Sequence, residues 1–257
     1  MNTPRLWTKD FLIVSTVNFF VAINFYLLMV IISVFAMENF HSTPSEAGLA
    51  SSIFVIGALI ARLFSGRWIE RIGRKKTLYV GLTSSLVMTL LYFGVNSVML
   101  LFVIRFLHGA AFGISSTATG TVVANIIPKE RRGEGIGYYM LSVSIAAAIG
   151  PFLAMFLSRH GDFTVIFITS AISGALSLVA TFYLLVPEIQ LTEEQLHEVK
   201  RLKLTGFLET KAIPISLVVP LFTSAIRLSL PSFQPMPKKF SWWGPPVSFI
   251  SCFLQRS

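Results

Sequence analysis

Residues 66–76, GRWIERIGRKK, separate two apolar segments and decide how the chain folds. The flanking segments, 47–65 and 77–95, are each about as long as a helix that crosses a bilayer. Between them lie five Lys and Arg residues, and such residues collect in the cytoplasmic loops of membrane proteins. Gly66 and Gly73 allow the backbone to reverse direction within a few residues. The stretch therefore predicts a short cytoplasmic turn between two membrane-spanning helices.

Apolar segments of this kind recur along the chain. Hydrophobic residues make up 54% of it and charged residues 13%, whereas an ordinary soluble domain carries about 25% charged residues. The backbone hydrogen bonds of a single span must close within that span, so each is predicted to be a helix. We therefore predict an all-α membrane protein in a lipid bilayer, with transmembrane helices at 11–36, 47–65, 77–95, 98–127, 136–157 and 163–186.

The basic residues sort into alternate loops. The amino terminus and the 2–3, 4–5 and 6–7 loops carry 14 Lys and Arg residues, and the other three loops carry one, Arg159. By the positive-inside rule, this asymmetry predicts a cytoplasmic amino terminus and a multi-pass location in the cell (inner) membrane. Arg62 lies toward the cytoplasmic end of the second span, where its side chain is expected to reach the interface.

Several function classes find no support in the sequence. Cys252 is the lone cysteine, and the four histidines lack the spacing of metal ligands, so we expect no metal site and no cofactor. No phosphate-binding loop or nucleophile elbow is present, which argues against an enzyme. The net charge of +9 resides in short loops between apolar segments, which favours membrane topology over nucleic-acid binding.

The basic loop resembles a signature of the major facilitator superfamily, G-x-L-x-D-R-x-G-R-R/K. The resemblance implies that Glu70, which replaces the usual Asp, pairs with basic neighbours in a charge lattice between the two halves of a transporter. A positive-inside loop without this role would account for the same basic residues. The candidate residues of this loop motif are Gly66, Glu70, Arg71, Gly73, Arg74 and Lys75.

Two further stretches are similar to motifs of the same family. Residues 105–113 resemble R-x-x-x-G-x-x-x-G, in which Gly109 and Gly113 would form a ridge for close helix packing. Arg105 at membrane depth predicts a functional site, with hydrogen bonding to carbonyls of its own bundle as the alternative. Residues 146–151 resemble the antiporter motif G-x-x-x-G-P, with Ala146 for the first Gly, and Gly150–Pro151 would supply a kink.

Polar residues within the spans are candidates for a transport cavity: Asn18, Asn24, Arg105 and His108. No Asp or Glu lies within the six predicted spans. A proton is a candidate coupling ion. Because the spans contain no carboxylate, the group that binds the proton would belong to the absent half of the transporter, or Arg105 would govern a nearby site.

The resemblance implies half of a major facilitator fold, with spans 1–3 and 4–6 as inverted repeats and a partial seventh helix. The expected function is efflux of a small molecule by a proton antiporter, of which this chain would be an inactive amino-terminal half that lacks its carboxy-terminal partner. Two alternatives stay open. The first is a six-span protein in which a second copy completes the transporter, and the second is a non-transporting membrane scaffold or regulator.

The last quarter of the chain changes character. After the bundle, 1–186, we predict a cytoplasmic linker with a short amphipathic helix at 187–211 and the start of a seventh span at 212–221. Six of the twelve prolines fall in residues 220–257, where no span can be built. Residues 222–257 are expected to be a non-native or disordered tail produced by a shift of reading frame, with a natural cytoplasmic tail as the alternative.

Overall fold

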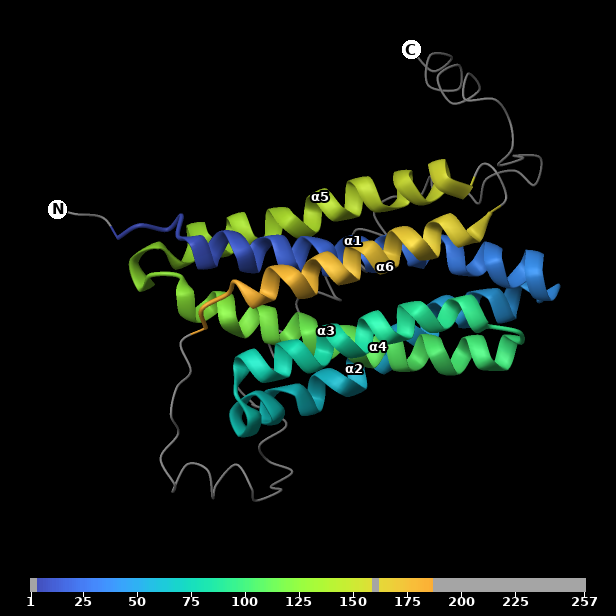
Figure 1. The fold of residues 1–257 in the computed structure, drawn as a ribbon, viewed down its shortest axis with the longest axis horizontal. Coiled ribbons are helices and arrows are strands. Elements are labelled where there is room, and N and C mark those ends of the chain that lie inside the picture. Colours follow the sequence, from blue (N-terminus) through green and yellow to red (C-terminus); the bar gives the residue numbers. More distant parts are fainter. Residues whose placement is uncertain (1–3, 159–161, 187–257) are drawn as a thin grey trace, which may run out of the picture. The chain divides into compact units, whose positions relative to one another are not determined.

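The fold is a bundle of six long helices, seen in a computed structural model that describes residues 4–158 and 162–186 (Figure 1). All six are long and apolar enough to cross a membrane, which confirms the predicted spans. The predicted linker, seventh span and tail lie outside the described residues. The helices are α1 Lys9–Phe40, α2 Pro44–Ile72, α3 Arg74–Leu91, α4 Val98–Ile126, α5 Arg132–Ser158 and α6 Phe163–Phe182, with short 3₁₀ turns η1 Tyr92–Gly94 and η2 Lys129–Arg131.

Local sequence signals set the ends of the helices. Thr43 caps α2 in a capping box, in which its side chain accepts from the Glu46 backbone and Glu46 accepts from the backbone N–H of Thr43. His41 ends α1 in the left-handed region at φ 52°. Gly73 has φ 94° and is the single residue between α2 and α3, so the turn needs its freedom from a Cβ. The turn predicted at residues 66–76 is therefore shorter than expected, because residues 66–72 continue α2 and Gly66 lies inside that helix.

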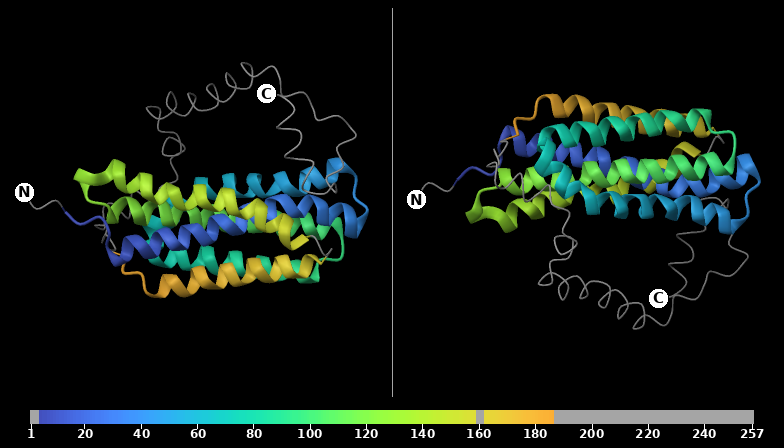
Figure 2. Two further views of the ribbon diagram at one scale, coloured as in Figure 1. Left: turned by 90° about the horizontal axis from the view of Figure 1, so that it is seen from above. Right: turned by 90° about the horizontal axis from the view of Figure 1, so that it is seen from below.

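The helix contacts follow the symmetry of a repeat. α2 packs chiefly against α4, and α5 packs chiefly against α1; likewise α3 packs against α4, and α6 packs against α1 (Figure 2). Exchanging α1–α3 for α4–α6 converts each contact into its counterpart. An odd number of helices per repeat starts the second repeat at the opposite end of the bundle, so the two repeats are inverted.

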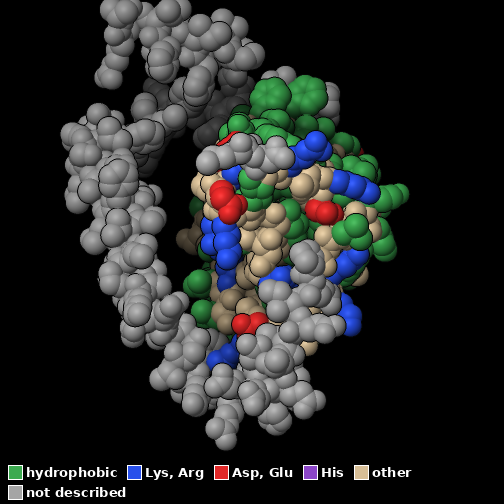
Figure 3. Space-filling view, turned by 90° about the vertical axis from the view of Figure 1, so that its left-hand side faces the viewer, with side chains coloured by type: hydrophobic (Ala, Val, Ile, Leu, Met, Phe, Trp, Pro, Cys, Tyr) green, Lys and Arg blue, Asp and Glu red, His purple; other side chains and the backbone are tan. Residues whose placement is uncertain are grey.

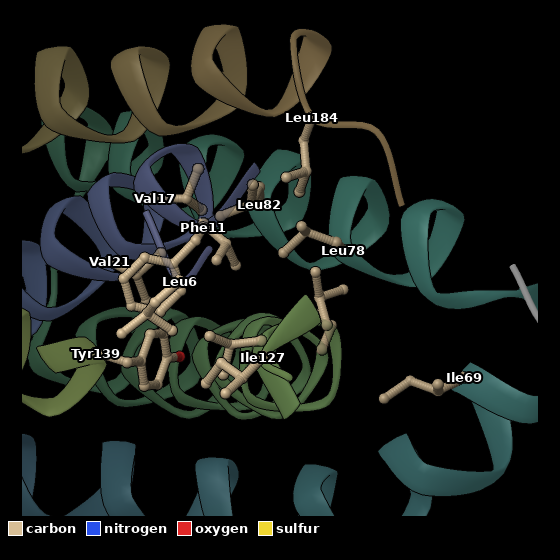
Figure 4. Packing of buried hydrophobic residues seen from close by; sticks show 14 residues of the cluster. Leu6, Phe11, Val17, Val21, Ile69, Leu78, Leu82, Ile127, Tyr139 and Leu184 are labelled. Carbon is tan, nitrogen blue, oxygen red and sulfur yellow. The ribbon is translucent and has the colours of Figure 1, made fainter. Parts of the chain in front are cut away.

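Two hydrophobic clusters hold the two ends of the bundle together. The first joins all six helices near the start of α1, where Phe11, Leu78, Ile127 and Tyr139 are buried together (Figure 4). The second lies toward the other end and includes Leu28, Ile32, Leu101 and Phe167. Between the clusters lie buried polar residues, whose side chains must find partners within the bundle. The clusters hold the bundle together, and the polar layer between them is where a site can form.

Glycines let α2 and α4 touch through their backbones. A Cβ at Gly109 would lie 2.0 Å from the carbonyl oxygen of Phe54, and one at Gly57 would lie 2.1 Å from that of Phe106. Side chains cannot fit at such distances, so the two helices meet closely only because these positions are glycine.

The outer surface and the ends of the bundle have opposite chemistry. Large apolar side chains such as Leu59, Phe152 and Phe182 are exposed along the helices, as expected for contact with lipid. Lys and Arg side chains gather at the end that holds the start of α1 and the α2–α3 and α4–α5 connections (Figure 3). At the other end, the described α1–α2 and η1–α4 connections carry no Lys or Arg.

Candidate functional site

A cavity of about 420 Å³ is bounded by four of the six helices, α1, α2, α4 and α5. On α2 its lining runs from Phe54 to Arg62, each ten residues from an end of the helix, so the cavity is at mid-depth. Val55 and Leu59 are more than half exposed, so the cavity lies at the bundle surface. It is lined by Asn18, Val21, Ala22, Phe25, Tyr26, Phe54, Val55, Ala58, Leu59, Arg62, Phe112, Ser116, Met140 and Val143.

Three phenylalanines form an aromatic cluster in the cavity wall, one each from α1, α2 and α4. The ring centroid of Phe25 lies 5.3 Å from that of Phe54 and 5.2 Å from that of Phe112. The ring centroids of Phe54 and Phe112 are 5.4 Å apart. Phe25 and Phe112 are stacked. Such rings offer an apolar, polarisable surface to an aromatic or apolar ligand.

Arg62 contributes the charge in the cavity wall. Its Nη2 donates a hydrogen bond of 3.4 Å to the Oγ of Ser116, and its Cζ lies 5.9 Å from the Phe112 ring centroid. Arg62 and Ser116 both line the cavity, so the fold directs the Arg62 side chain toward α4. That this side chain reaches the membrane interface stays a prediction. An arginine within an apolar span was the signal in the sequence that could have identified it.

Arg105 is buried behind the aromatic cluster and is not a lining residue. Its Nε donates to the carbonyl oxygen of Ala50 at 3.1 Å, and its Cζ lies 4.4 Å from the Phe54 ring centroid. Its Nη1 and Nη2 atoms are buried and have no hydrogen-bond partner among the described residues. The hydrogen bond from Arg105 to the Ala50 carbonyl is the structural role that the sequence analysis gave as the alternative. The Nη1 and Nη2 groups still need hydrogen-bond partners, as buried donors do.

The other polar candidates divide between the cavity and the helix interfaces. Asn18 lines the cavity and donates from Nδ2 to the Oγ of Ser142 at 2.9 Å. Asn24 is buried against α6, where its Nδ2 donates to the carbonyl oxygen of Ser170 at 2.9 Å. Neither Asn24 nor His108 lines the cavity.

His108 joins α4 to the end of α3. Its Nε2 lies 3.0 Å from the Oγ of Ser85, and its Nδ1 lies 3.1 Å from the hydroxyl of Tyr92. Both ring nitrogens therefore have partners, and the ring packs against Phe54 with centroids 5.4 Å apart. These contacts favour a packing role between three helices.

The loop motif lies at the end of α2 and the start of α3. Glu70 is exposed, and no ion pair that includes it is seen within residues 4–158 and 162–186. The ion pair in this part of the chain joins Arg131 to Glu134 at 2.7 Å. The local pairing expected for Glu70 is therefore not found in the described bundle.

The small residues of the motifs lie at helix contacts. A Cβ at Gly113 would lie 2.5 Å from the carbonyl oxygen of Ala58, and one at Gly150 would lie 2.6 Å from the Cβ of Tyr26. Pro151 lies inside α5, which continues to Ser158. Gly109 and Gly113 thus serve the α2–α4 contact, and Gly150 serves its counterpart in the repeat, between α5 and α1.

The described part of the chain contains no group of three His, Cys, Asp or Glu side chains placed to hold a metal ion.

Inverted three-helix repeats with a mid-depth cavity on one face define one half of a secondary transporter fold. A crystal structure of a mutant of the peptide transporter POT has this fold: the TM-score is 0.65 at 16% identity, and the match covers 88% of this chain and 48% of that one. The chain belongs to the Major Facilitator Superfamily, whose sequence model matches residues 14–254.

Curated relatives in the family include transporters of different kinds. Multidrug resistance protein 2 of Bacillus subtilis is 30% identical over 179 residues, 68% of this chain and 44% of that protein. The Na(+), Li(+), K(+)/H(+) antiporter of Planococcus maritimus is 26% identical over 206 residues, 78% of this chain and 47% of that protein. The chain thus matches about half the length of these relatives. The family match also extends over most of residues 222–257, where a shifted reading frame stays a prediction.

Proposed function

We propose that this chain forms one six-helix half of a transporter that exports small molecules, and that the cavity between α1, α2, α4 and α5 is its share of the substrate path. The cavity is the observation that carries the proposal. Its volume of about 420 Å³ falls within the range of small-molecule sites. Its wall is largely apolar, with a few polar groups to orient a ligand.

The chemistry of the wall fits a substrate with a sizeable apolar body. Phe25, Phe54 and Phe112 supply an aromatic surface, while Asn18 and Ser116 supply hydrogen-bonding groups. Similarity to a multidrug resistance protein supports efflux as the direction. A pocket of this kind separates ligands by shape and charge and not by one fixed set of hydrogen bonds.

A second six-helix unit would complete the path. The cavity lies at the surface of the bundle. In transporters of this class the substrate site lies at the interface between two repeated units, which here would be two six-helix halves. The match with this chain covers only 44% and 47% of two relatives, so each has room for a second half in one chain. We propose that these 257 residues do not transport alone and that the exposed wall of the cavity meets a second half.

The basic end of the bundle would be cytoplasmic, in the cell (inner) membrane. The backbone N–H of Leu185, just beyond α6, donates to Asp10 Oδ1 at 2.9 Å, so the chain enters and leaves the bundle at the same end. That end also carries the α2–α3 and α4–α5 connections with their Lys and Arg residues (Figure 3). Basic loops stay in the cytoplasm because the insertion machinery retains them there.

Proton coupling would require a titratable group from outside this cavity. No Asp or Glu of residues 4–158 and 162–186 lines the cavity, and each of those that these ranges contain lies within three residues of a helix end or in a connection. We propose that the second half supplies the carboxylate that exchanges protons for substrate.

The test is an efflux assay on a chimera that joins residues 1–186 to the carboxy-terminal half of Multidrug resistance protein 2. We expect dye efflux from cells with the chimera and none with the 257-residue chain. Val55→Trp places a larger side chain in the cavity, leaves less room for a substrate and should lower efflux about tenfold. Val87→Trp, on the exposed surface of α3 and outside the cavity, is the matched control.

Absence of efflux from a chimera that reaches the membrane would contradict the proposal. Efflux by the 257-residue chain alone would instead favour a second copy as the partner, which crosslinking of a specific homodimer would verify.

A further inference from the structure

We propose that the cavity selects amphiphilic organic anions: molecules with an aromatic or apolar body and one carboxylate, sulfonate or phosphate group. The inference rests on the proposed function and names the substrate class of the same site. It follows from the charge and the geometry of the cavity wall.

Among the described residues that line the cavity, Arg62 is the one with a charged side chain, and none of them is a carboxylate that could oppose it. The Asp and Glu residues of the described bundle lie at helix ends and connections: Asp10, Glu38, Glu46, Glu70, Glu130, Glu134 and Asp162. Arg62 is ten residues, about 15 Å, from the end of α2. At this depth the low dielectric strengthens its attraction for an anion.

The guanidinium of Arg62 has hydrogen bonds to spare for a ligand. Among the described residues its partner is Ser116, through Nη2 at 3.4 Å, and this long bond uses one of five N–H donors. The side chain is exposed to the cavity and not buried against protein. A carboxylate, sulfonate or phosphate accepts two parallel hydrogen bonds from a guanidinium fork, which is the strongest arrangement Arg offers.

A second cation lies behind the aromatic wall. The Cζ of Arg105 is 4.4 Å from the centroid of Phe54, which itself lines the cavity. Burial leaves the charge of Arg105 unscreened by water, and no acidic side chain of the described bundle pairs with it. Both arginines therefore raise the electrostatic potential in the cavity, and this potential disfavours a lipophilic cation.

The aromatic cluster provides the other half of recognition. Phe112 is stacked on Phe25 and lies 5.9 Å from the Cζ of Arg62, measured to its ring centroid. An anionic group at Arg62 would thus place the body of the ligand against Phe112 and its neighbours. A ligand with both parts would use both surfaces at once.

Binding of two probes with one aromatic body tests the inference on the full 257-residue chain in lipid nanodiscs. Naphthalene-2-sulfonate should bind about tenfold more tightly than 2-naphthylmethylammonium, by calorimetry, as expected for a charge-assisted hydrogen bond in place of a repulsion. Arg62→Gln should lower sulfonate affinity about tenfold, and Arg62→Glu should reverse the preference. Arg5→Gln removes an exposed arginine outside the cavity and should leave both affinities unchanged.

Tighter binding of the ammonium probe, equal sulfonate affinity in the Arg62→Gln variant, or no binding of either probe would overturn the inference. Failure of the proposed function has a different signature. If the chimera exports dyes irrespective of their charge and of Arg62, transport stands and anion selection fails. If the sulfonate binds through Arg62 but the chimera exports nothing, the site stands and the transport proposal fails.

Discussion

The Nε of Arg105 on α4 donates a hydrogen bond of 3.1 Å to the carbonyl oxygen of Ala50 on α2. The two residues are buried at the contact between the helices, where α4 approaches α2 through its glycines. A backbone carbonyl inside a helix is already an acceptor for its own helix, so this second bond uses a lone pair that most helix carbonyls leave free. Arg105 therefore links the two helices that form one wall of the cavity.

Replacing Arg105 with lysine should abolish transport by the chimera. Lys keeps the charge but has neither the Nε donor nor the planar group that contacts Phe54. We expect the Arg105→Lys chimera to reach the membrane in normal amount and to lose dye efflux, measured beside immunoblots of the membrane fraction. Efflux at the level of the unmodified chimera would reduce Arg105 to a replaceable structural residue.

Adding one methyl group at Gly109 should separate α2 from α4. The new Cβ would lie 2.0 Å from the carbonyl oxygen of Phe54, so the helices must move apart. We expect Gly109→Ala to cost about 1–3 kcal/mol of stability, measured by thermal unfolding in detergent. Gly120→Ala, on the same helix with nothing within 4 Å, is the matched control and should be neutral or slightly stabilising. Equal melting temperatures for the two variants would show that the close contact is not needed.

Single cysteines should report the orientation of the bundle. In a Cys252→Ser background, cysteines at Ser42 and Ser97 should react with impermeant thiol reagents from outside the cell, because they lie in the α1–α2 and η1–α4 connections. A cysteine at Glu134, near the start of α5, should react only after permeabilisation. Outside labelling at Glu134 would reverse the topology.

Glu70 should matter only when a second half is present. It is exposed at the end of α2 and has no ion pair within the described bundle, so Glu70→Gln should leave the stability of the 257-residue chain unchanged. In the chimera the same variant should reduce efflux, because the carboxylate would bind across the interface. Glu134→Gln, which breaks the exposed ion pair with Arg131, is the control. It should change neither the stability of the 257-residue chain nor efflux by the chimera. Equal destabilisation by Glu70→Gln with and without the second half would assign it a local role.

Sequencing the gene tests the origin of the tail. If residues 222–257 arise from a shifted frame, the original frame should continue through roughly five more apolar spans of about 20 residues each. A stop codon early in that frame would establish the tail as natural.

The local parts of the fold could be predicted from the sequence because a bilayer imposes them on each segment separately. A run such as 98–127 must be helical, since its backbone has no other hydrogen-bond partners in lipid, and α4 spans Val98–Ile126. Gly73 marked the turn between α2 and α3 through its lack of a Cβ. Helix ends were less accurate: α1 runs to Phe40 although its apolar pattern ends near residue 36.

The site depended on which way each helix faces, and the sequence does not show this. These helices are apolar around most of their circumference because lipid and protein interior are equally apolar, so no stripe of hydrophobic residues marks the buried face. Arg62 and Arg105 were both visible as cations within spans. Only the packing of α2 on α4 directs Arg62 into the cavity and encloses Arg105 behind Phe54.

The sequence by itself determined that the chain forms six membrane-spanning helices, roughly where they turn, and that Gly109 and Gly113 form a packing ridge, because each follows from segment length, charge and local sterics. The tertiary structure decided that α1, α2, α4 and α5 line a cavity at the bundle surface, that three phenylalanines from three helices meet in its wall, and that Arg62 is the charged residue among the described residues of that wall. Those features depend on the rotation and register of one helix against another, which only the close contacts between helices fix.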